Sequence, residues 1–290
     1  MAISDTYQGF NVTRHEPGIA LVTFDQPERM NGMSVGLKRD LVEFALQAQM
    51  DDSVRVVVFT GSGRAFCAGD DLSGGYTNPR FAPQAVPALS PGHTEPISTY
   101  GALRGVSQAV NRAIRELDKL SIAAINGVAI QTGFSLALAC DFRIAATTAR
   151  LGSATLRFGL LPDEGGQWLL VQTIGVAKTM DFLMRKRIVS GVEAAELGLV
   201  HEACEPEELL TKALALAKEL AEGPQVAMRM LKRSVLAAAE LSFAQACEEI
   251  ASKTAVTDYH PDAHEGVVAF RDKRPAEFNA WLDARRRDGA

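Results

Sequence analysis

Residues 133–137, Gly-Phe-Ser-Leu-Ala, fall one residue short of the G-x-S-x-G turn that exposes a nucleophilic serine. A serine hydrolase also needs a histidine later in the chain and an acid that orients it. Three histidines follow Ser135, but none has a spacing that indicates a triad, and Ala137 replaces the second glycine. The pattern therefore favours Ser135 as a pocket residue at the start of a helix over Ser135 as a nucleophile.

A second segment with the composition of a ligand loop is the glycine-rich run GSGRAFCAGDDL at 61–72. It follows residues 54–60, which are apolar enough to form a strand buried on both faces, as in a parallel sheet. Glycine lets a backbone approach a ligand closely. We therefore expect a ligand-facing loop at the end of this strand.

The surrounding pattern predicts the elements that position these segments. Strands are expected at 19–25, 54–60, 122–130 and 142–146, and helices from Ser34, as cap, to Met50 and over 102–119. This alternation predicts a layered α/β unit with crossover connections. The strands are expected to stop after about residue 190, with helices at 206–222, 225–240, 242–256 and 262–272. Residues 73–100 hold five prolines and three glycines and are predicted to form a lid or flap.

Composition excludes several classes of protein. The 290 residues are 47% hydrophobic, and the net charge of −5 gives no sign of a nucleic-acid partner. No apolar run of about 18 residues exists to span a membrane. The four cysteines are far apart, without the spacing of a zinc site or a disulfide framework, so we expect a cytoplasmic protein with no metal.

Three segments, taken in order, resemble one superfamily. They are 64–72 (RAFCAGDDL), 125–141 and 151–168, supported by 175–203 and by 265–278. Their order and spacing are similar to the crotonase superfamily of enoyl-CoA hydratases and isomerases, over roughly residues 10–280. The resemblance implies an α/β fold with a spiral of repeated ββα units at 1–203 and a C-terminal helical trimerisation region at 204–290. It also implies an acyl-CoA substrate, no further cofactor, and a homotrimer or hexamer.

The family chemistry depends on two backbone N–H groups that stabilise a thioester enolate. The resemblance assigns these donors to Asp70, just after Gly69, and to Thr132. In the segment INGVAIQTG, Gln131 and Thr132 replace two of three family glycines and only Gly133 remains. A backbone donor survives such a change. The same resemblance gives further substrate-binding positions. They are Arg29 and Met30 in the segment PERMN at the adenine, Ala65, Ala68 and Gly69 along the pantetheine, and Gly133, Ser135 and Thr155 in the pocket. Arg29, Lys273 and Arg274 are the candidate cations for the CoA phosphates.

Both glutamates of the family hydratases are missing. Their positions hold Ser135 and Thr155, whose hydroxyls have no useful acid–base range near neutral pH. Asp163 and Glu164 in LPDEGG stand where family isomerases carry one catalytic carboxylate. One acid suffices to move a proton between two carbons, so we expect isomerisation through Asp163, with Glu164 as the alternative.

Other interpretations stay open. Hydration handled by Asp163 or Glu164 is one, and an acyl-CoA binder with little turnover is another. Asp163 and Glu164 are also good caps for the helix that follows. Asp71 is expected to stabilise its turn, whereas the side chain of Asp70 is a candidate for reaching the pocket. His93, Tyr76 and Tyr100 in the long loop are weaker candidates for substrate contact.

Overall fold

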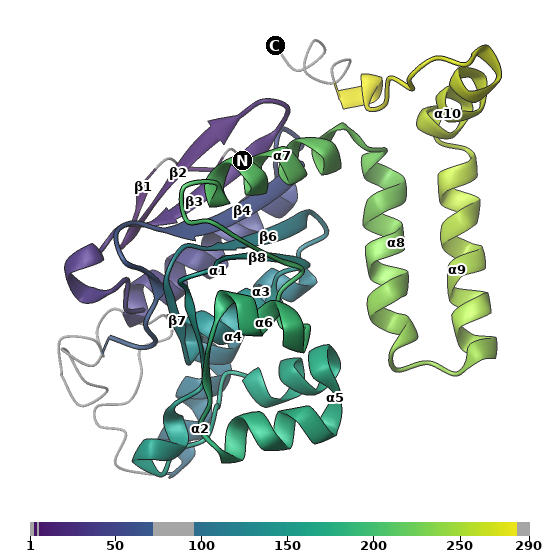
Figure 1. The fold of residues 1–290 in the computed structure, drawn as a ribbon. Helices are drawn as coiled ribbons and strands as arrows, with labels where there is room; N and C mark the ends of the chain where they lie inside the picture. Colours follow the sequence, from purple (N-terminus) through teal and green to yellow (C-terminus); the bar gives the residue numbers. More distant parts are fainter. Residues whose placement is uncertain (1–2, 5, 72–95, 283–290) are drawn as a thin grey trace.

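The computed structural model describes residues 3–4, 6–71 and 96–282. A sheet of seven strands in the order β1-β2-β3-β4-β6-β8-β11 forms its centre (Figure 1). The first three strands pair antiparallel and the pairs from β3 to β11 are parallel. The strands are β1 Thr6–Tyr7, β2 Phe10–His15, β3 Ile19–Phe24, β4 Val56–Gly61, β6 Leu120–Ile125, β8 Phe142–Ala146 and β11 Glu202–Cys204. The central strand β4 is apolar on both faces and buried, as its sequence predicts.

A second sheet of four short strands has the order β10-β9-β7-β5. These are β5 Ala65–Cys67, β7 Val128–Ile130, β9 Arg150–Gly152 and β10 Ile188–Ser190. Each of the consecutive strand pairs β4–β5, β6–β7 and β8–β9 places its first strand in the large sheet and its second in the small one, and a helix follows each pair. This repetition confirms the predicted spiral of ββα units. It also brings the ends of β5 and β7 together, because these two strands pair in parallel.

Helices of the core surround the two sheets. They are α1 Val35–Met50, α2 Pro96–Ala102, α3 Gln108–Glu116, α4 Thr132–Ala139, α5 Gly166–Met184, α6 Gly191–Leu197 and α7 Leu209–Glu222, with a π-helical segment Leu103–Ser107 joining α2 to α3. The predicted cap of α1 is confirmed, since Ser34 Oγ accepts from Leu37 N at 3.1 Å. Helix α7 packs against β3, β4, β6 and β8 through its buried alanines Ala213, Ala217 and Ala221.

The remaining helices follow α7, and the first of them contacts the core through Lys232 and Asp141. Helices α8 Gln225–Ala238 and α9 Phe243–Asp258 form a hairpin beside it, and α10 Pro261–Asp272 lies at the end of α9 (Figure 1). A capping box at Ser242 and Gln245 starts α9. The four predicted C-terminal helices therefore exist. The boundary after residue 203 stays a prediction. Helix α7, which follows that boundary, packs on the large sheet, and the helical hairpin beside the core begins with α8.

Three expectations about elements differ from the structure. Residues 122–130 are two strands of different sheets, separated by a turn at Asn126 and Gly127. Strands do not stop near residue 190, since β11 pairs in parallel with β8. The helix predicted from residue 102 begins at Pro96, so the end of the predicted lid is helical. The rest of that segment, with Tyr76 and His93, lies within 72–95, outside the described residues.

In the described part of the chain, no helix combines the length and the apolar character that crossing a membrane requires.

Candidate active site

The turn after β5 is held on both sides. Gly69 has a φ of +110°, a left-handed conformation that favours glycine. Ala68 N donates to Met30 O at 3.0 Å, and Met33 N donates to Gly69 O at 2.8 Å. The ligand-facing loop predicted from the glycines is thereby fixed against residues 30–33. Asp70 follows Gly69 directly. These two backbone hydrogen bonds therefore orient the Asp70 peptide N–H before any substrate binds.

The first turn of α4 lies against this loop. A Cβ added to Gly133 would stand 2.2 Å from Cys67 O, and one added to Gly69 would stand 3.4 Å from Gln131 Cβ. Gln131 takes the positive φ of 51° from which the helix starts. As the first residue of α4, Thr132 has no partner within the helix for its N–H. The two residues predicted to supply backbone donors, Asp70 and Thr132, therefore lie side by side.

The Thr132 side chain contacts that of Asp70 and that of a second acid, Glu164. Thr132 Oγ1 lies 2.5 Å from Asp70 Oδ1 and 2.6 Å from Glu164 Oε1. Gln131 Nε2 donates to the other oxygen of Glu164 at 2.9 Å. Lys38 Nζ lies 2.7 Å from Asp70 Oδ1. The structure thus brings together three of the predicted catalytic residues, together with Lys38 and Gln131, which the sequence had not singled out as catalytic.

The surroundings of Glu164 raise its pKa toward neutral pH. Its side chain is buried, with 3% of the residue exposed. Burial raises its pKa to about 7, and the neighbouring charges of Asp163 and Asp70 add to this, while the Thr132 hydrogen bond and Lys38 oppose it. A carboxyl that titrates near neutral pH can both take and return a proton under ordinary conditions.

Asp163 occupies a different environment. It is half-buried, and burial raises its pKa, as does the charge of Asp70, whereas a hydrogen bond from its own backbone and the charge of Lys38 lower it. The N-cap of α5 is Gly165, with a φ of +92°, and the carboxyl oxygens of Glu164 bond to Thr132 and Gln131 on α4. The two acids form a pair, and Glu164 is the member that reaches the α4 terminus. The acid–base role predicted for Asp163 stays a prediction.

The two positions of the missing glutamates line the same region. Ser135 is buried, and a Cβ added to Gly166 would stand 2.5 Å from its Oγ. Thr155 Oγ1 lies 3.2 Å from Ser153 Oγ, which donates to Gln131 Oε1 at 3.0 Å. Thr155 therefore supports the side chain that holds Glu164. Neither hydroxyl has the titration of a carboxylate.

The two histidines His201 and His260 lie elsewhere. His201 Nδ1 accepts from Arg143 N at 3.1 Å, and His260 caps α10, the helix that contains His264. This leaves Ser135 without a histidine partner in the described residues, so the structure gives no support to a hydrolase triad. The described residues also contain no group of three or more His, Cys, Asp or Glu placed to hold a metal ion.

The remaining predicted substrate contacts fall into two groups. Met30 has a φ of +55°, and Ala65 O accepts from Asn31 Nδ2 at 2.7 Å, so this segment and β5 are joined. Arg29 is half exposed and pairs with Asp71 at 3.1 Å, in keeping with a turn-stabilising role for that aspartate. Lys273 and Arg274 follow α10, which Figure 1 shows far from α4 in the same chain, and Arg274 pairs with Glu265. Tyr100 lies in α2 beside Arg104.

The comparisons with known proteins agree with this geometry. A family model for enoyl-CoA hydratase/isomerase matches residues 14–281. The chain belongs to the enoyl-CoA hydratase/isomerase family. Its relatives include a 1,2-epoxyphenylacetyl-CoA isomerase of Escherichia coli (strain K12), 32% identical over 93% of this chain and 98% of the relative. A probable enoyl-CoA hydratase of Rhodobacter capsulatus is also 32% identical, over the same shares.

Solved structures of the enoyl-CoA hydratase/isomerase family share the fold. A putative enoyl-CoA hydratase from Streptomyces coelicolor A3(2) aligns with a TM-score of 0.85 at 29% identity, covering 96% of this chain and 97% of that one. An enoyl-CoA hydratase from Bacillus anthracis aligns with a TM-score of 0.83 at 27% identity. The predicted crotonase fold is confirmed, and the chain is an enzyme of the enoyl-CoA hydratase/isomerase type.

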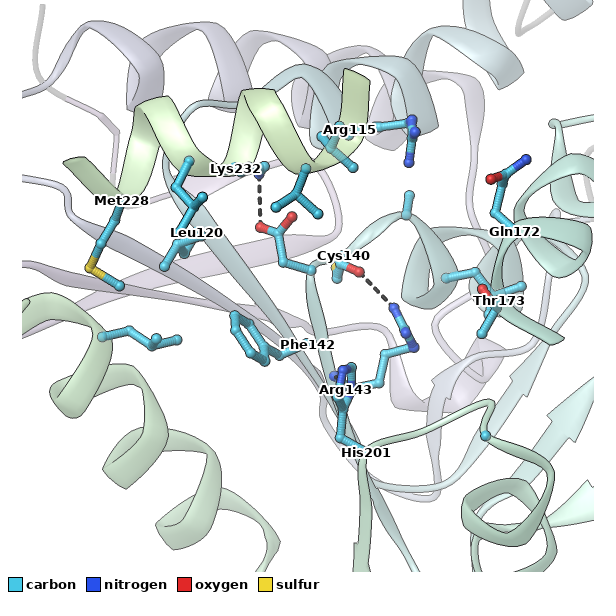
Figure 2. A pocket seen from close by; sticks show the side chains of 18 residues that line it. Arg115, Leu120, Cys140, Phe142, Arg143, Gln172, Thr173, His201, Met228 and Lys232 are labelled. Carbon is cyan, nitrogen blue, oxygen red and sulfur yellow. Dashed lines mark hydrogen bonds and ion pairs between the residues drawn. The ribbon is translucent and has the colours of Figure 1, made fainter. Parts of the chain in front are cut away.

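A second cavity, distinct from the candidate active site, lies between α8 and the core. It has a volume of about 630 Å³, and Figure 2 shows its side chains. Its charged groups are engaged: Lys232 Nζ lies 2.7 Å from Asp141 Oδ2, and Arg143 donates to Cys140 O at 2.7 Å. The cluster of Lys38, Asp70, Gln131, Thr132 and Glu164 does not line this cavity. We assign it to the seating of α8 on the core.

Proposed function

We propose that the enzyme moves a double bond along an enoyl-CoA chain, with Glu164 as the single acid–base group. The observation that carries this proposal is one buried carboxyl, with a pKa of about 7, next to the residues assigned as backbone donors, Asp70 and Thr132. Glu164 removes a proton from the carbon beside the thioester carbonyl and returns it two carbons further along. The Asp70 and Thr132 N–H groups stabilise the enolate between these steps.

One finding supports isomerisation over hydration. Ser135 and Thr155 stand in place of the two glutamates of family hydratases. The names of the relatives do not separate the two reactions, because an isomerase and a probable hydratase are both 32% identical to this chain. The alternative is hydration, and the Asp163–Glu164 pair favours it, because one acid of such a pair can activate water while the other donates a proton.

A panel of thioesters separates these reactions. The purified enzyme is given 3-enoyl-CoA, 2-enoyl-CoA and the 1,2-epoxide of phenylacetyl-CoA. The position of the double bond is followed by the absorbance of the conjugated thioester, and the uptake of water by mass spectrometry in H₂¹⁸O. We expect the 3-enoyl chain to convert to the 2-enoyl chain without ¹⁸O uptake. Hydration of the 2-enoyl chain at a higher rate would reject the isomerase assignment in favour of the alternative. Tight binding without turnover of any of the three would identify a binder.

We further propose that the chain assembles as a homotrimer or hexamer through the helices after α7. Large apolar side chains on them are exposed in the single chain, with Phe243 86% and Phe270 85% exposed. Such exposure is typical of surfaces that another protein covers. The paired variant Phe243→Asp/Phe270→Asp is expected to lower the mass measured by size-exclusion chromatography with light scattering to that of a monomer. Met50→Asp, at a 74% exposed position of the core, is the control and should keep the assembled mass. A monomeric unmodified protein would contradict the proposal.

A further inference from the structure

The Thr132 hydroxyl has more partners than hydrogens. It lies 2.5 Å from one carboxyl oxygen of Asp70 and 2.6 Å from one of Glu164, and it carries a single hydrogen. It can donate to only one of these oxygens. The second short contact requires a hydrogen on the other carboxyl, since two bare oxygens at 2.6 Å repel. One of the two acids is therefore protonated in this arrangement.

Lys38 decides which acid that is. Its side chain is 2% exposed, and its ammonium group lies 2.7 Å from the same Asp70 oxygen and donates to Ser107 Oγ at 2.9 Å. A buried ammonium group holds its partner carboxylate in the charged form. Asp70 is thus the anion, and it accepts from both Lys38 and Thr132.

Glu164 has the surroundings of the protonated acid. One of its oxygens accepts from the neutral Gln131 amide, its other oxygen faces the Thr132 hydroxyl, and the side chain is buried. With the proton on the oxygen that faces Thr132, Glu164 donates to Thr132 and Thr132 donates to Asp70. Every short contact in the line from Lys38 to Glu164 then has one hydrogen.

We propose that Lys38, Asp70 and the Thr132 hydroxyl form a relay that controls when Glu164 holds its proton. When Glu164 ionises, the Thr132 hydrogen turns from Asp70 to the new carboxylate. When Glu164 takes a proton from a substrate, the hydrogen turns back to Asp70. No proton leaves Thr132, so atoms and charges balance in both directions. Lys38 and Asp70 are positioning residues for Glu164, and this part rests on the proposed function.

The groups that face Glu164 determine whether each substitution raises or lowers its pKa. The charges of Asp163 and Asp70 raise its pKa, while Lys38 and the Thr132 hydrogen bond lower it. The Cys67 thiol stays neutral, because burial raises its pKa to about 12, and the amides of Gln131 and Asn111 carry no charge. Glu164 is therefore the acid below about pH 7 and the base above it.

An infrared titration tests the relay without any substrate. The band of the protonated Glu164 carboxyl is identified by its loss in Glu164→Gln, and its midpoint is followed with pH. Asp70→Asn is expected to lower the midpoint by about one pH unit, because a neighbouring negative charge is removed. Thr132→Val should raise it, since the ionised form loses a donor. Thr132→Ser keeps a hydroxyl and should titrate like the unmodified enzyme.

A second comparison tests Lys38. Lys38→Met should produce one additional protonated carboxyl band near neutral pH, from Asp70, and the double variant Lys38→Met/Asp70→Asn should lack it. This double variant leaves no unpaired buried charge, so it guards against a folding failure of the single change. A midpoint that stays the same in Thr132→Val, or rises in Asp70→Asn, would overturn the relay. If the midpoints shift as expected but no thioester is isomerised, the proposed function fails while the relay stands.

Discussion

Replacing Glu164 with glutamine is expected to lower kcat for double-bond migration by about 10²–10⁴-fold, the usual contribution of one general acid–base group. Glutamine has nearly the same shape, and its amide can still bond to Thr132 and Gln131, so the pocket should remain intact. The value of KM should change little, because Glu164 acts on the reacting carbon atoms and not on the CoA moiety. Stopped-flow absorbance of the conjugated thioester product measures kcat and KM together.

Asp163→Asn is the matched control for this experiment. It changes the neighbouring acid in the same way, but Asp163 is half-buried, whereas the carboxyl oxygens of the buried Glu164 bond to Thr132 and Gln131. We expect a loss of less than about tenfold, with an activity profile displaced toward lower pH because a negative charge beside Glu164 is gone. A large loss in Asp163→Asn beside a mild one in Glu164→Gln would assign the chemistry to Asp163, as the sequence alone had suggested.

The choice between these two acids shows where sequence reasoning stops. Asp163 and Glu164 are adjacent, of the same chemical type, and just ahead of one helix. Which of them faces α4 depends on the backbone between them and α5, including the left-handed Gly165. Motif position brought the prediction to this dipeptide but could not give the direction of either side chain.

Lys38 was harder to recognise from the sequence as a residue of the site than either acid was. It lies next to Leu37 and three residues before Leu41, both in the buried stripe of α1, so a helical projection places it at the edge of that stripe. A lysine there is usually a solvated flank whose stem covers apolar surface. Its burial against Asp70 depends on the turn after β5, which is distant in sequence.

The helices and strands also divide into those that local sequence predicts and those that depend on distant pairing. The capped helix α1 and the buried strand β4 were predictable, because cap, periodicity and composition agree within a few residues. Strand β11 has only three residues, and its existence depends on pairing with β8, nearly sixty residues earlier. The run 122–130 is divided between the two sheets at Asn126 and Gly127, a dipeptide typical of turns, so the expectation of one continuous strand overlooked a local signal.

Gly133→Ala is expected to remove most activity and to lower the free energy of unfolding. The added Cβ would stand 2.2 Å from Cys67 O and 2.7 Å from Cys67 Cβ, so α4 or β5 must shift. Overpacking of this kind costs about 1–3 kcal/mol. The shift also moves Thr132 relative to Asp70, and misplacing one backbone donor lowers kcat by about 10²–10³-fold. Urea unfolding and steady-state kinetics measure the two effects.

Gly101→Ala separates the clash from the general effect of the substitution. Gly101 is helical and exposed in α2, and no atom lies within 4 Å of an added Cβ. Alanine there should leave kcat unchanged and stabilise the protein by up to about 1 kcal/mol, because glycine is the poorer helix former. Full activity in Gly133→Ala would mean that the start of α4 can move away from Cys67 without disturbing the chemistry. The Thr132 N–H would then have no part in stabilising the enolate, and the donor would have to be sought elsewhere along the acyl-CoA path.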